Sequence, residues 1–144
     1  MSRPLIVIPA RIGSTRFPRK PLADIAGISM IRRTANIASQ VEHTDYIVAT
    51  DSKEIAAHCE AHNIPVTMTR ADILSGSDRV LAAAKATGST SDILVNLQGD
   101  APFTDPTHIA AVIKALADKT VDIATPYIRL GLSLIHISEP TRPY

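Results

Sequence analysis

The stretch L-I-V-I-P-A-R-I-G-S-T-R-F-P-R-K-P-L, residues 5–22, decides the fold. It opens with four consecutive aliphatic residues, and no polar residue alternates with them. This pattern is typical of a strand that is buried on both faces of a parallel sheet. The strand runs directly into a loop rich in arginine, lysine and proline, and ligands of open α/β sheets bind at the carboxyl ends of the strands. The sequence therefore predicts a parallel sheet with a binding loop behind its first strand.

Short apolar runs alternate with helical patterns along the rest of the chain. We expect further strands at residues 46–49, 64–68, 92–97 and 122–125. Helices are expected at about residues 30–41, 53–62, 76–86 and 106–119. Elements that alternate at this spacing predict right-handed βαβ crossovers, and hence an α/β, Rossmann-like, doubly wound and mostly parallel sheet.

Composition excludes several classes of protein. The 144-residue chain has a formal net charge of +1, which is too small to suggest a nucleic-acid-binding protein. Cys59 is its one cysteine, so no internal disulfide can form, which fits a reducing compartment. The apolar run at residues 5–8 is too short for a signal peptide or a membrane span. We therefore expect a cytoplasmic protein that binds neither nucleic acid nor membrane.

The loop after the first strand concentrates positive charge, with Arg11, Arg16, Arg19 and Lys20 in one short segment. Such cations repel one another, so a bound polyanion would stabilise the loop; a solvated basic loop is the alternative. The backbone amides of residues 13–15 can form a nest for phosphate oxygens, while Arg11 and Lys20 supply charge-assisted contacts. Neither G-x-x-x-x-G-K-[ST] nor G-x-G-x-x-G is present, so this is not a P-loop or an ordinary dinucleotide site.

Two further loops follow predicted strands. Asp100, in Q-G-D-A-P at residues 98–102, can hold Mg²⁺ together with substrate phosphates and waters, or it can form an Asx turn or a helix cap. The loop of residues 68–79 leads to a helix N-terminus that can face a nucleotide or sugar; a serine N-cap with solvated charges is the alternative. We expect these loops to share one site with the basic loop, since all three follow strands that we take to be adjacent.

A pair of histidines is a weaker candidate site. His58 and His62 are four residues apart on a predicted helix, a spacing that can chelate a metal. No third ligand or general-base glutamate accompanies them at a supporting spacing. We prefer a solvated helix surface.

The end of the chain does not continue the pattern. The string L-S-L-I-H-I-S-E-P-T-R, residues 132–142, resembles a translated sequencing-library adapter. A native amphipathic strand with a proline-rich end is the alternative. We expect residues 131–144 to be a non-native tail without functional residues, and the natural protein to continue past residue 130 with a different sequence.

Four motifs stand in order along the chain: P-A-R-I-G-S-T-R-F-P-R-K-P-L at residues 9–22, V-A-T-D at 48–51, M-T-R-A-D-I-L-S-G-S-D-R at 68–79 and V-N-L-Q-G-D-A-P at 95–102. Together they resemble the 3-deoxy-manno-octulosonate cytidylyltransferases, or CMP-KDO synthetases. The resemblance implies transfer of CMP from CTP to an eight-carbon acidic sugar, 3-deoxy-D-manno-octulosonate (KDO), with release of pyrophosphate, for lipopolysaccharide biosynthesis. It makes residues 1–130 the nucleotide-binding part of a truncated cytidylyltransferase domain of the nucleotide-diphospho-sugar transferase type. Mg²⁺ is the implied cofactor and a homodimer the implied full-length assembly.

The resemblance also implies roles for individual residues. The catalytic residues would be Arg11, Lys20 and Asp100, with Asp100 as the Mg²⁺ ligand. The residues around CTP and the sugar would be Pro9, Ala10, Arg11, Ser14, Lys20, Arg70, Ser75, Gly76, Arg79 and Gln98. Of these, Pro9 and Ala10 would face the cytosine, Ser14 the triphosphate and Gln98 the sugar. Arg19 would not be a ligand, because the family often has glycine there.

Two positions depart from the family pattern. Ile73 stands where the family usually has histidine, and Ala101 where it usually has glutamate. A different acidic sugar, sialic-acid-like or amino-KDO, is therefore an alternative substrate, and a non-catalytic nucleotide-binding fragment is an alternative function. Because the family's remaining sugar, metal and dimer residues would lie past residue 130, we expect this chain to have little or no transferase activity.

Overall fold

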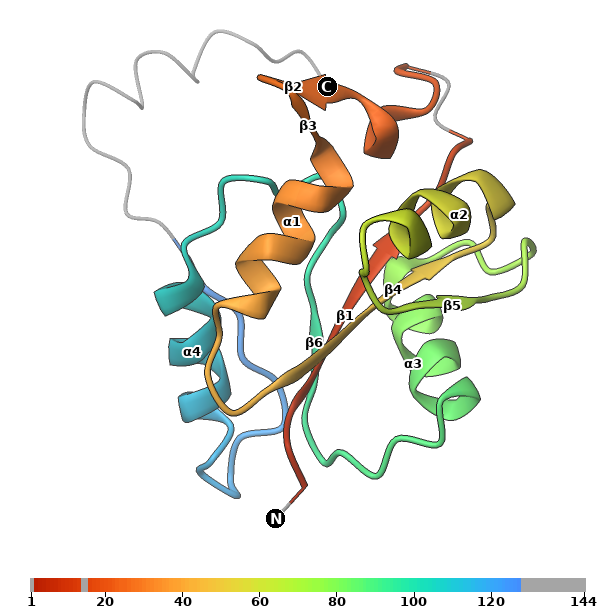
Figure 1. Ribbon diagram of the computed structural model, residues 1–144. Helices are drawn as coiled ribbons and strands as arrows, with labels where there is room; N and C mark the ends of the chain where they lie inside the picture. Colours follow the sequence, from red (N-terminus) through yellow and green to blue (C-terminus); the bar gives the residue numbers. More distant parts are fainter. Residues whose placement is uncertain (1, 14–15, 128–144) are drawn as a thin grey trace, which may run out of the picture.

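Four parallel strands form the central sheet of the computed structural model, which describes residues 2–13 and 16–127 (Figure 1). β1 (Leu5–Ala10) lies in the middle, paired with β4 (Asp45–Thr50) on one side and β6 (Leu94–Asn96) on the other. β5 (Val66–Met68) pairs with the far side of β4, giving the order β5-β4-β1-β6. The predicted parallel α/β sheet is confirmed.

Helices cover both faces of this sheet. They are α1 (Met30–Ser39), α2 (Lys53–Ala61), α3 (Gly76–Ala86) and α4 (Pro106–Ala115). Successive residues of β1 point to opposite faces. Ile6 and Ile8 pack in a core with buried residues of α1, α2 and α4, while Leu5 and Val7 pack against α3. Figure 1 shows α1 and α4 on one side of the sheet and α3 on the other, so the sheet is doubly wound.

Polar side chains begin three of these helices by accepting hydrogen bonds from the otherwise unpaired amides of the first turn. Ser52 accepts from the Ile55 amide in α2, Ser75 from the Asp78 amide in α3, and Asp105 from the Thr107 amide in α4. Pro106 occupies the first turn of α4, where its missing N–H costs nothing.

The core is aliphatic and also encloses the one cysteine. Every residue of β1 is buried, as its uninterrupted apolar run predicts. Cys59 is fully buried among the residues that join α1 and α2 to the sheet. Burial raises the pKa of its thiol to about 11, with a smaller contribution from Glu60.

The prediction of a fifth strand at residues 122–125 is wrong. These residues have no strand structure, and the side chain of Ile123 is 86% exposed. A strand needs a hydrogen-bonded neighbour, and none of the described residues pairs with this segment. The strand predicted at residues 92–97 is also shorter and less buried than expected, since β6 is an edge strand.

A short hairpin between β1 and α1 was not predicted from the sequence. It follows a 3₁₀ turn, η1 (Lys20–Leu22), and consists of β2 (Asp24–Ile25) and β3 (Ile28–Ser29), joined through Gly27 at a φ of 88°. The Asp24 carboxylate accepts a hydrogen bond of 2.6 Å from the Gly27 amide. The hairpin holds the end of the basic loop against the start of α1.

Two sequence predictions concern residues that the structure does not describe. The proposed tail, 131–144, falls within residues 128–144, and Ser14 falls in the gap at residues 14–15. Among the residues that are described, no helix is long and apolar enough to cross a membrane.

Candidate functional site

A cleft of about 280 Å³ opens where the ends of β1 and β6 meet the start of α3. Its walls are Pro9, Ala10, Arg11, Lys20, Pro21, Leu74, Gly76, Arg79, Gln98, Gly99 and Asp100. All the site residues predicted from sequence line it, apart from Arg70, Ser75 and the undescribed Ser14. Pro21, Leu74 and Gly99 were not predicted.

Lys20 and Asp100 meet across this cleft. The Lys20 ammonium donates a hydrogen bond of 3.3 Å to an oxygen of the Asp100 carboxylate. The two side chains are 39% and 54% exposed, so both charges also face solvent. The pair joins residues 80 positions apart in the sequence. It shows that the basic loop and the loop after β6 converge on one point.

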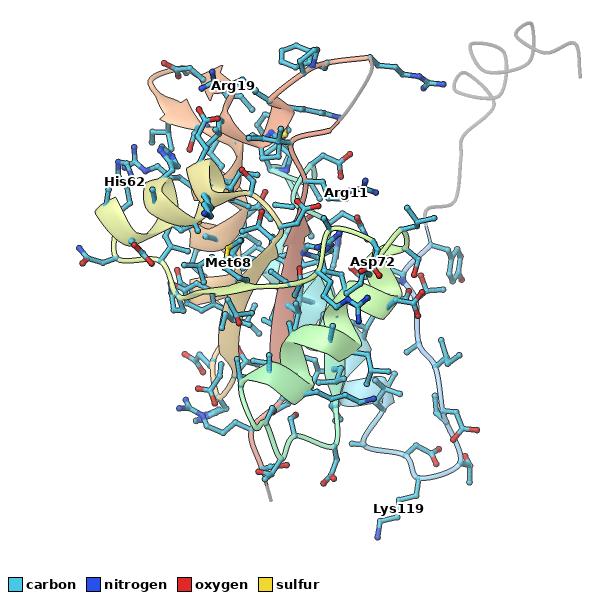
Figure 2. The ribbon with its side chains drawn as sticks, turned by 90° about the vertical axis from the view of Figure 1, so that its right-hand side faces the viewer. Arg11, Arg19, His62, Met68, Asp72 and Lys119 are labelled. Atoms are coloured by element: carbon cyan, nitrogen blue, oxygen red, sulfur yellow. The ribbon has the colours of Figure 1, made fainter. Side chains whose placement is uncertain are left out.

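The backbone around η1 explains how Lys20 reaches the cleft. Arg19 precedes the turn with a φ of 59°, in the left-handed region that favours glycine. The Leu22 amide then donates to the Arg19 carbonyl at 3.0 Å, and the buried Pro21 anchors the turn. The guanidinium of Arg19 forms an ion pair with Glu54 of α2, outside the cleft. Figure 2 shows Arg19 well above Arg11, consistent with its exclusion from the predicted ligands.

Arg11 extends from the end of β1 toward the loop between β5 and α3 (Figure 2). Its guanidinium is exposed and donates a long hydrogen bond of 3.4 Å to the Leu74 carbonyl. The Leu74 side chain is itself 80% exposed at the cleft. Arg11 therefore has donors available to an anion in the cleft.

Two glycines allow the walls of the cleft to approach closely. A Cβ on Gly99 would lie 2.9 Å from the Pro9 carbonyl oxygen, a backbone atom that cannot move aside. The Gly99 carbonyl also accepts a buried hydrogen bond of 3.1 Å from Thr34 in α1. A Cβ on Gly76 would lie 2.9 Å from the Gln98 amide nitrogen. Gly99 thus joins β1 to the β6 loop, and Gly76 lets α3 reach Gln98.

Arg70 and Ser75 are not among the residues that line this cleft. Arg70 is exposed and pairs with Asp72 at 2.5 Å, outside the cleft. Their hydrogen bond raises the pKa of Arg70 and lowers the pKa of Asp72. Ser75 caps α3 and donates to the Asp78 carboxylate at 2.7 Å. Ser75 thus forms the N-cap that the sequence left open as an alternative for this loop.

Arg79 forms part of the cleft wall but is only 1% exposed. Its guanidinium donates to the Thr69 hydroxyl, to the Arg70 carbonyl at 3.3 Å and to the Ile73 carbonyl at 2.7 Å. It also lies 3.7 Å from the Asp51 carboxylate. These contacts direct its donors into the protein.

The loop of residues 68–79, the third of the predicted site loops, lies farther from the other two than expected. The prediction that all three loops follow adjacent strands is wrong, because β4 separates β5 from β1. Only the start of α3 and Leu74 bring this region to the cleft.

Ala101, at one of the two departures from the family pattern, is half-buried and packs against the core.

The histidine pair is not simply a solvated surface. His58 is half-buried and lies 2.7 Å from the Ser29 hydroxyl, and the His62 ring stacks at a tilt against it. Burial lowers the pKa of His58, and the positive charges of His62 and Arg32 lower it further. Within the described part of the chain, no group of three or more His, Cys, Asp or Glu side chains could hold a metal.

Comparison with known proteins decides the family. The family model described as cytidylyltransferase matches residues 5–139. The chain belongs to the cytidylyltransferase family. Among curated relatives of this family, a 3-deoxy-manno-octulosonate cytidylyltransferase from Chelativorans sp. (strain BNC1) is 43% identical over 141 residues, which are 96% of this chain and 55% of that protein. One of the same name from Rhodopseudomonas palustris (strain BisA53) is 50% identical over 129 residues, covering 87% and 52%.

A solved structure of another cytidylyltransferase supports the same assignment. It is that of CMP:2-keto-3-deoxy-manno-octonic acid synthetase complexed with CTP, which is 37% identical with a TM-score of 0.78. The match covers 83% of this chain and 49% of that one. The chain spans about half the length of the curated relatives it matches.

Proposed function

We propose that this chain is the CTP-binding part of an enzyme that transfers CMP from CTP to 3-deoxy-D-manno-octulosonate and releases pyrophosphate. The observation that carries the proposal is the contact between Lys20 and Asp100 at the carboxyl ends of two adjacent parallel strands. A cation and a carboxylate placed together there suit a metal-bound triphosphate. The names of the relatives supply the sugar and the nucleotide.

The chain's own residues divide the work of binding. Arg11 and Lys20 would neutralise the triphosphate, Lys20 as a mobile point charge and Arg11 as a planar fork. By the resemblance, Pro9 and Ala10 would offer backbone groups at the end of β1 to the base, and Gln98 would face the acceptor sugar. Holding the triphosphate in one geometry accounts for most of what a protein contributes to in-line attack on phosphorus.

Asp100 fits the implied Mg²⁺. It is an exposed carboxylate on the cleft, and Mg²⁺ is usually held by one or two carboxylates together with substrate phosphates and waters. When bound, Mg²⁺ would stabilise the negative charge that develops on the pyrophosphate leaving group. Lys20 would then exchange its contact with Asp100 for a contact with phosphate.

Calorimetry of Mg²⁺·CTP binding tests the proposal. We expect the 144-residue chain to bind the complex, and Asp100→Asn to weaken binding by about tenfold or more through loss of the metal carboxylate. Asp92→Asn is the matched control, because it removes an exposed carboxylate that lies just before β6, at the other end of the strand from the cleft. Equal losses in both variants, or no binding by the unmodified chain, would contradict the proposal.

The length of the chain favours a second candidate, a nucleotide-binding fragment without transferase activity. The chain spans about half the length of its relatives, and the resemblance implies that the family's remaining sugar and metal residues lie in the other half. We expect Mg²⁺·CTP binding without release of pyrophosphate when KDO is added. Sialic acid and amino-KDO, offered to a chain extended to the length of its relatives, test the alternative sugars that Ile73 and Ala101 leave open.

Three further properties belong to this proposal. A full-length homodimer follows from the resemblance and is checked by sedimentation. A cytoplasmic location is supported by the single cysteine. A non-native tail at residues 131–144 is supported by the adapter-like string, although the family match extends to residue 139. Longer clones of the gene test it directly.

A further inference from the structure

A buried arginine organises the loop that links β5 to α3. Arg79 lies in the first turns of α3, and its guanidinium contacts the Thr69 hydroxyl and the Arg70 and Ile73 carbonyls. Each of these groups belongs to the segment of residues 69–74. Residues 70–72 and 74 of this segment are exposed and have no regular secondary structure. The segment therefore depends on few contacts, and Arg79 supplies three of them.

The charge of Arg79 is stabilised from a second direction. Asp51, at the end of β4, places a carboxylate oxygen 3.7 Å from the guanidinium, and its side chain is only 17% exposed. A buried charge needs such partners, because removing it from water is costly. Arg79 therefore links the end of β4, the 69–74 segment and the start of α3 in one polar network.

The same segment reaches Arg11. The Leu74 carbonyl accepts the hydrogen bond from the Arg11 guanidinium, and Leu74 also lines the cleft. Arg79 makes its shorter backbone hydrogen bond to the Ile73 carbonyl. Ile73 directly precedes Leu74 in the chain. A displacement of the segment at Ile73 would thus move the group that orients Arg11.

We propose that Arg79 is a positioning residue, which fixes residues 69–74 and through the Leu74 carbonyl holds Arg11 toward the triphosphate. The inference rests on the proposed function, since Arg11 is the group that would contact phosphate. A direct ligand role fits poorly, because a side chain that is 1% exposed would have to give up its hydrogen bonds to reach CTP. Arg79 acts on CTP through Arg11.

Amide hydrogen exchange tests the structural half of this proposal without any ligand. Arg79→Lys keeps the charge but loses the fork that reaches both carbonyls, so exchange at residues 70–74 should accelerate about tenfold or more. Thr69→Val, a milder change that removes one acceptor, should accelerate it less. Lys85→Gln is the control, because Lys85 is an exposed cation in the last turn of the same helix. Unchanged exchange in both Arg79→Lys and Thr69→Val would overturn the proposal, whether or not CTP binds.

A double-mutant cycle tests the link to Arg11. Arg79→Lys should weaken Mg²⁺·CTP binding about tenfold in the unmodified chain, but by less than about twofold when Arg11 is already alanine. Losses that simply add would show that Arg79 acts independently of Arg11, and would overturn the proposal. If the unmodified chain binds no CTP, the proposed function fails, while the exchange experiment still decides whether Arg79 fixes the segment.

Discussion

The loop after β1 and the loop after β5 both match motifs of nucleotide-binding sites, yet their side chains differ in exposure and in the partners they contact. In the first, Arg11 and Lys20 point into the cleft and are partly exposed to solvent. In the second, Arg70 pairs with Asp72 on the surface, Ser75 caps a helix and Arg79 is buried. A motif match therefore identifies a region of the site, and the contacts of each side chain show which charged groups are exposed at the cleft and which are engaged elsewhere in the protein.

The largest effect should come from the first loop. We expect Lys20→Met to lower the affinity for Mg²⁺·CTP by about 100-fold, or about 2.7 kcal/mol, because it removes a charge-assisted contact to phosphate. Titration calorimetry measures this. Lys119→Met is the matched control, since Lys119 lies at the far end of the molecule from Arg11 (Figure 2). An equal loss in Arg70→Ala would remove the distinction between the two loops.

The next effect concerns the support beneath the first loop. Gly99→Ala would place a Cβ 2.9 Å from the Pro9 carbonyl oxygen, with the side chains of Ala10 and Ile31 also within 3.6 Å. We expect the free energy of unfolding to fall by about 2 kcal/mol, as in other overpacked interiors. Urea denaturation followed by circular dichroism measures the change. An unfolding free energy equal to that of the unmodified chain would mean that the strand ends are less closely packed than the structure shows.

The smallest effect sharpens the description of the second loop. Ser75→Ala should lower the free energy of unfolding by about 1 kcal/mol through loss of the N-cap of α3, while the affinity for Mg²⁺·CTP changes by less than about twofold. Ser75→Asn should restore stability, because asparagine is an equally good cap. A large loss of affinity in the asparagine variant, with stability restored, would make Ser75 a ligand after all.

The central part of the fold could be predicted because its signals are local. The apolar run of β1 identifies a fully buried strand, and the spacing of buried residues in α1 identifies its inner face. The segment around Ile123 shows where this reasoning fails. Its residue types suit a strand, but whether a strand forms depends on a neighbour to pair with, which local sequence does not specify.

The location of the site could be predicted from sequence, but the contacts and burial of its individual side chains could not. The resemblance brought Lys20 and Asp100 together as members of one site, although their contact across 80 residues is a property of the strand order. The burial of Arg79 could not be predicted, because an arginine near a helix N-terminus gives no sign in the sequence of being buried. Gly99 could have been recognised as a site residue, since a glycine behind a buried strand often marks a close backbone approach.

The burial of Cys59 makes its thiol a probe of local unfolding. Only a thiolate reacts readily with disulfide reagents. The one thiol of the chain is buried and its pKa is raised to about 11, so it reacts very slowly while the protein is folded. Labelling then proceeds only in molecules that have opened between α2 and the sheet. The rate of that reaction reports the open population of each variant, and so distinguishes loss of ligand binding from unfolding of the protein.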